Sequence, residues 1–225
     1  MSDFSKLRSM VEENTSLAKA EKELAQTMKS LGKLELERSK ARENLTKKEF
    51  ELAKVGEDMA LKAKDLAEKR IKAKQKGFID VTDGELKRDK DYAEYNGKIA
   101  KNRRETNQIQ EKIAAKEKDI AHEKMKLADE KMDVAKTRDK LADKQLNYVK
   151  IASANQPEEK KVKAQKDYLD QEKHLEKEKK DVLKKERTLR ELENQIADLK
   201  KQLSIKISEK ENIRHPESPP TPTTV

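Results

Sequence analysis

The sequence predicts an all-α protein, an elongated antiparallel three-helix coiled coil with very long helices. Within residues 113–142, a large apolar residue followed by alanine recurs every seven positions, which is the spacing of a coiled-coil seam. Apolar residues make up only 33% of the chain and charged residues 44%, too little apolar material for the round core of a catalytic domain. Long helices that bury a narrow stripe accommodate both observations.

The first helix is expected over residues 4–76, where large apolar residues also repeat at intervals of seven and a small residue follows most of them. Arg38 interrupts this repeat between Glu35 and Arg42, which indicates either a polar layer that aligns the helices or a loosely packed turn. The same large-small order in both helices predicts one shared core. The repeating large residues are Met10, Leu17, Leu24, Leu31, Leu45, Leu52, Met59 and Leu66.

A second helix is expected over residues 83–152. Residues 77–82 break the repeat, and Thr82 and Glu85 have the spacing of a capping box, with Val81 and Leu86 placed as a hydrophobic staple. At 1.5 Å per residue this helix would be roughly 105 Å long. Leu127 lies in the middle of its regular repeat, so we expect Leu127 to be buried against both neighbouring helices.

A third helix is expected over residues 157–212. Asn155 can cap it, and Pro157 is tolerated in a first helical turn. The short connections on either side of the second helix favour antiparallel neighbours, because a few residues can reverse a chain but cannot carry it back along a long helix. Residues 1–212 are therefore expected to form one domain. The seam of the third helix comprises Tyr168, Leu175, Val182, Leu189, Ile196 and Leu203.

Residues 213–225 are rich in proline and are expected to form a disordered tail. The last three residues, which end at Val225, resemble the C-terminal ligand of a PDZ groove. A tail that only improves solubility is the alternative interpretation.

The sequence contains no pattern typical of catalysis, of a metal site or of a cofactor. There is no cysteine, the histidines His122, His174 and His215 are far apart, and the five glycines do not cluster. No apolar run approaches the roughly 20 residues that a membrane-spanning helix needs. We therefore expect a non-enzymatic protein without cofactor, cytoplasmic or peripheral at membranes.

The formal net charge of +9 favours anionic partners, and two clusters of basic residues concentrate this charge near the expected helix ends. Each basic residue near an anionic membrane contributes about 1 kcal/mol of attraction, so both clusters are candidate lipid-binding sites. The alternatives are complementarity to the helix dipole for the first and an ordinary solvated face for the second. Nucleic acid is disfavoured, because no stacking aromatics are interleaved. The clusters comprise Lys69, Arg70, Lys72, Lys74 and Lys76, and Lys160, Lys161, Lys163 and Lys166.

Residues 133–175 resemble the end of the second helix and the start of the third in BAR (Bin/amphiphysin/Rvs) domains. That family often shows the pattern D-x-D-x-x-R-x-x-L, a lysine-rich turn with P-E-K, and A-x-x-x-[YF]. Ala135 replaces the second acidic residue of the first pattern. The resemblance implies a homodimeric, crescent-shaped coiled coil that senses or shapes curved membranes through basic residues. The matching residues are Asp133, Arg138, Leu141, Pro157, Glu158, Lys160, Ala164 and Tyr168.

The leading interpretation is a dimeric scaffold of BAR type that binds anionic, and curved, membranes. The alternative is a cytoskeletal or filament-forming coiled-coil protein, in which the same seams assemble rods and the charges set their stagger. Both interpretations expect a homo-oligomer, either a dimer or a filament. Sedimentation with and without lipid distinguishes them.

Overall fold

The computed structural model of the chain describes residues 3–154 and 156–213. These residues form three α-helices and no strand: α1 (Asp3–Gln75), α2 (Asp83–Ser153) and α3 (Glu158–Glu211). The all-α prediction of three long helices is thereby confirmed, and each helix bound lies within one residue of the expected position. Asn155 and nearly all of the expected tail, including Val225, lie outside the described residues.

The contacts within the chain group into two compact units. Unit 1 comprises Met1–Arg38 and Lys118–Asn194, and unit 2 comprises Ser39–Glu117 and Gln195–Val225. Each unit contains parts of all three helices. In a long helix, a residue touches only those residues of its neighbours that lie at the same level, so the contacts cluster by level along the helices.

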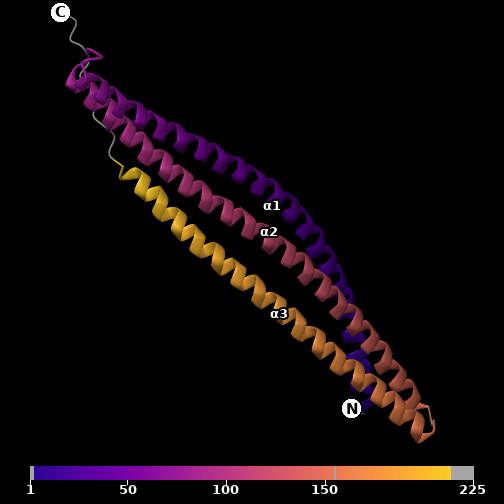
Figure 1. Ribbon diagram of the computed structural model, residues 1–225. Helices are drawn as coiled ribbons and strands as arrows, with labels where there is room; N and C mark the ends of the chain where they lie inside the picture. Colours follow the sequence, from indigo (N-terminus) through magenta and orange to yellow (C-terminus); the bar gives the residue numbers. More distant parts are fainter. Residues whose placement is uncertain (1–2, 155, 214–225) are drawn as a thin grey trace, which may run out of the picture. The chain divides into compact units, whose positions relative to one another are not determined.

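In unit 1, α1 and α2 pair in opposite directions (Figure 1). Lys22 lies 2.9 Å from Asp139, and Lys29 lies 2.6 Å from Asp129, so the residue number falls on α2 as it rises on α1. The facing residues are small and buried, with Ala18, Ala25 and Gly32 on α1 and Ala128, Ala135 and Ala142 on α2. The two backbones therefore approach closely.

Gly32 shows how close this approach is. A Cβ atom placed on Gly32 would lie only 2.8 Å from Cγ of Met125 on α2. Nearby, Asn14 donates a hydrogen bond of 2.9 Å to Gln145, a side chain that is only 2% exposed. The small residues of each large-small pair thus form much of the interface between α1 and α2, with a partly buried amide pair at one end.

The large residues of α1 do not form the core that the sequence indicated. In unit 1, Met10, Leu17, Leu24 and Leu31 are between 40% and 57% exposed. The physical reason is geometric: small side chains form most of the interface between α1 and α2, and the large residues beside them on α1 point out of that interface. The expectation of a core shared through the large residues of both helices was therefore wrong for α1.

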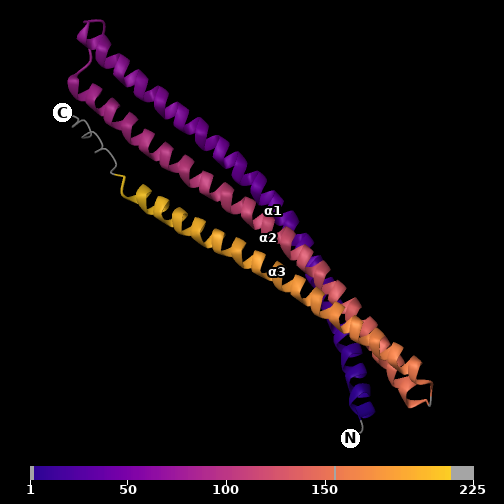
Figure 2. The same cartoon turned by 60° about the horizontal axis from the view of Figure 1, so that its bottom comes forward.

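The large residues of α2 in unit 1 are covered by α3. Val134, Leu141 and Leu175 are buried together, and Tyr168 and Val182 of α3 pack against them. Figure 2 shows α3 beside α2 from a second direction. Leu127 is 5% exposed, which confirms its predicted burial. Two ion pairs show that α1 and α3 both pass the level of Leu127. Asp129 pairs with Lys29 of α1, and Glu123 lies 3.6 Å from Lys185 of α3.

The connection between α1 and α2, in unit 2, carries the capping signals read from the sequence. The N–H of Gly77 donates to the carbonyl of Lys74 (2.8 Å) and that of Phe78 to Ala73 (2.9 Å), which is the Schellman arrangement. Gly77 has φ of 73°, a conformation that glycine adopts without a steric cost. Gly77 therefore terminates α1 by adopting the left-handed conformation that this arrangement requires.

The start of α2 confirms the predicted capping box. The hydroxyl of Thr82 accepts the N–H of Glu85 (3.2 Å), and the carboxylate of Glu85 accepts the N–H of Thr82 (3.0 Å). Leu86 is buried and Val81 is half-buried, as expected of a staple. At the start of α3, the carbonyl of Pro157 accepts the N–H of Lys160 (3.0 Å).

Unit 2 repeats the arrangement of α1 on α2, with Ala53, Ala60, Ala67 and Ala93 buried between the helices. Arg104 of α2 lies 3.0 Å from Glu57 of α1, and Asn107 donates to the carbonyl of Glu49 (2.9 Å). The last part of α3 lies along α2: Asn102 donates to the carbonyl of Lys206 (2.9 Å), and Lys206 also lies 3.0 Å from Glu105.

Candidate functional site

The first basic cluster, here called the α1-end cluster, comprises Lys69, Arg70, Lys72, Lys74 and Lys76 and belongs to unit 2. Arg70 forms an ion pair with Asp89, and Lys74 lies 2.7 Å from Asp83, so α2 neutralises two of the five charges. Lys69 and Lys72 are exposed on a different face of α1, and Lys76 is exposed in the turn that follows the helix. These three are the exposed lysines of the cluster.

The helix dipole accounts for part of the α1-end cluster. Lys72 and Lys74 lie in the last turn of α1, where a positive charge complements the partial negative charge of the unpaired carbonyl groups. This contribution does not compete with ligand binding, because a lysine at the end of a helix keeps its ammonium group in water.

The second basic cluster, here called the α3-start cluster, comprises Lys160, Lys161, Lys163 and Lys166 and belongs to unit 1. Lys161 lies 3.4 Å from Glu158 and is half-buried, whereas the other three lysines are exposed. Ala164 is buried and fixes which side of α3 faces α2. The two clusters lie beside different helix connections and in different units.

Comparisons of the chain with protein-family models, with curated proteins and with solved structures found no significant match. In the part of the chain that the structure describes, no helix is long and apolar enough to cross a membrane. Within residues 3–154 and 156–213, no three His, Asp or Glu side chains converge as metal ligands would. The resemblance to BAR domains therefore stays an expectation from the residues that carry it.

A third surface was not predicted from the sequence. We call it the leucine row and define it as Leu45, Leu52, Val55, Met59 and Leu66 of α1 in unit 2. Each of these side chains is between 54% and 69% exposed. A signal for it was present in the sequence: α1 and α2 each carry a heptad row of large residues, and the heptad row of α3 from Tyr168 to Leu203 can face only one of them.

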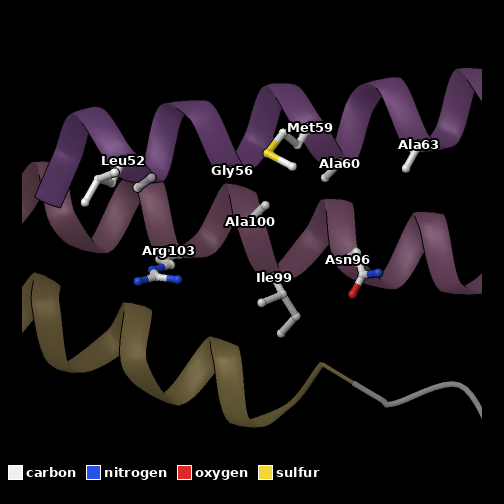
Figure 3. Close-up of a pocket in the computed structure, with 10 residues that line it drawn as sticks. Leu52, Gly56, Met59, Ala60, Ala63, Asn96, Ile99, Ala100 and Arg103 are labelled. Atoms are coloured by element: carbon white, nitrogen blue, oxygen red, sulfur yellow. The ribbon is translucent and has the colours of Figure 1, made fainter.

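A groove between α1 and α2 runs beside the leucine row (Figure 3). Leu52, Gly56 and Met59 line it from α1, and Ile99 and Ala100 line it from α2. Small residues form its floor, so the groove can accept side chains from another helix in the manner of a coiled coil.

Proposed function

We propose that this protein is a non-enzymatic scaffold that binds anionic membrane surfaces through the α1-end and α3-start clusters. The observation that carries the proposal is the presence, in each cluster, of three exposed lysines beside a helix connection. Three lysines that approach an anionic bilayer together contribute about 3 kcal/mol, which is sufficient for reversible adhesion. The local resemblance to BAR domains at the α2–α3 connection supports the same proposal, and it extends the proposal to curved membranes.

The test is co-sedimentation of the full chain with vesicles of phosphatidylserine and phosphatidylcholine. Replacing Lys160, Lys161, Lys163 and Lys166 by glutamine should weaken binding by about tenfold or more, because each lysine near the surface contributes about 1 kcal/mol. Binding by the parent should also fall as salt rises, since screening acts within about 8 Å at physiological ionic strength.

The matched control removes four exposed lysines from the middle of the same helix: Lys173, Lys177, Lys180 and Lys184. The net charge then changes by the same amount, so only the position of the charges differs. Equal loss of binding in both variants would show attraction by net charge alone. A parent that ignores phosphatidylserine at low salt would refute membrane binding.

Curvature is tested by repeating the measurement on vesicles of several diameters at constant lipid concentration. A preference for one size supports a shaped binding surface, and equal binding to all sizes restricts the function to adhesion.

The second candidate is a filament-forming coiled-coil protein of the cytoskeleton. The exposed leucine row favours it, because an open apolar seam can assemble helices from several copies of the chain. Assemblies that continue to grow with protein concentration, without lipid, would support this candidate over the membrane scaffold.

A further inference from the structure

The leucine row is an unpaired coiled-coil seam. Leu52, Val55 and Met59 follow at steps of three and four residues, and Leu45 and Leu66 extend the same face by seven residues at either end. Single exposed leucines are common on protein surfaces, but a contiguous apolar row on one helix face marks an interaction site. The row therefore requires a partner that covers it.

The helix α3 does not cover the row in unit 2. Ile196 is buried, and the contacts of Asn102 and Glu105 with Lys206 hold α3 along α2. Figure 3 shows Ile99 and Arg103 on the side of α2 that is nearer α3, and Leu52 and Met59 on α1 across the groove. The groove and the leucine row are thus left open to another molecule.

The chemistry of this face specifies its partner. Lys48 and Lys62 stand in line with Val55 at spacings of seven, and both are exposed. The partner must therefore bring an apolar heptad row together with carboxylates at heptad spacing. The helix α1 itself has this composition, because Glu51 and Asp58 immediately precede Leu52 and Met59 and are exposed.

We propose that the leucine row is the surface on which a second copy of this chain docks, with α1 of one copy antiparallel to α1 of the other. A two-fold axis lets the same patch serve both copies, as in most homodimers. The five side chains expose on the order of 500 Å² per copy, a large share of the roughly 800 Å² that each partner buries in a standard interface.

This inference deepens the proposed function by naming the protein partner of the scaffold, but it is tested without lipid. Sedimentation equilibrium of the full chain over a wide concentration series should show a dimer that dissociates on dilution. Met59→Glu replaces an apolar side chain in the middle of the row by a carboxylate and should raise the dimer dissociation constant by about a hundredfold, because a charge is costly to remove from water.

The matched control is Leu61→Glu. Leu61 is 55% exposed on the same helix, but it lies outside the leucine row and borders a hollow on another side of the α1–α2 pair. This variant should dimerise as the parent does. Helicity measured by circular dichroism should be equal in all three proteins, because neither side chain is buried within its own chain.

Three results would overturn the inference: a parent that stays monomeric at every concentration, a Met59→Glu variant that dimerises as tightly as the parent, or unlimited growth of the parent. Failure of the membrane proposal is seen separately in vesicle sedimentation. A dimer that does not bind anionic vesicles would contradict only the membrane proposal. A monomer that binds them would contradict only the dimer proposal.

Discussion

At the scale of single residues, the capping box at Thr82 and Glu85 links the sequence directly to a pH response. The hydrogen bond from the backbone N–H of Thr82, followed by that from its hydroxyl, lowers the pKa of Glu85 from its ordinary value of 4.5. A carboxylate with a lowered pKa stabilises the folded state above its unfolded pKa, and this contribution is lost as the pH falls through the folded pKa.

We therefore expect Glu85→Gln to be less stable than the parent at neutral pH, with a difference that shrinks below about pH 4, in the range of carboxylate pKa values. Urea unfolding followed by circular dichroism at several pH values measures both proteins. Glu209→Gln is a control, because Glu209 pairs with Lys206 near the end of α3 and caps no helix start. A difference that stays constant with pH would contradict this role of Glu85.

At the scale of helices, leucines on α1 and α2 differ in how much they contribute to the free energy of unfolding, because some are buried and others are exposed. Leu127 on α2 is 5% exposed and Leu61 on α1 is 55% exposed. Truncation of a buried leucine leaves a cavity and costs about 2–5 kcal/mol, whereas an exposed leucine loses little.

Leu127→Ala should therefore lower the free energy of unfolding by about 2–5 kcal/mol, and Leu61→Ala by less than about 1 kcal/mol. Both substitutions have the same effect on helix propensity, so the comparison isolates packing. Chemical denaturation monitored by far-UV circular dichroism measures each. Equal losses would mean that Leu127 is not packed between α1 and α3.

At the scale of the whole molecule, local pattern determined the elements, and packing partners decided which residues were buried. The helix bounds could be predicted because Gly77, the Thr82–Glu85 box and Pro157 are local signals. The sequence could not predict whether the large or the small residue of each pair on α1 is buried, since both recur at heptad spacing. That choice depends on how many rows α3 can cover, which is a property of three helices together.

The same distinction applies to the candidate sites. The basic clusters were visible as runs of lysine, but the pairing of Arg70 with Asp89 and of Lys74 with Asp83 depends on the antiparallel arrangement of two helices. The leucine row was visible as a repeat and was assigned to the core, because the sequence does not state which apolar row lacks a neighbour.

Limited proteolysis of the whole chain tests the arrangement of its elements. Among the described residues, the connection at residues 76–82 should be cut well before residues 113–142, because packed helices have the lowest population of locally open states. Mass spectrometry identifies the first fragments. First cuts within residues 113–142 would contradict the packing of α2 between its neighbours.

The alanines between α1 and α2 do not by themselves fix the alignment of these two helices. Because small residues recur every seven positions on both helices, sliding α1 past α2 by seven residues again sets small side chains on small side chains. Such a slip in one direction replaces Asn14 by Leu7 opposite Gln145, which leaves a buried amide without its 2.9 Å hydrogen bond. The hydrogen bond between Asn14 and Gln145 therefore helps to specify the register of two helices of more than 70 residues each.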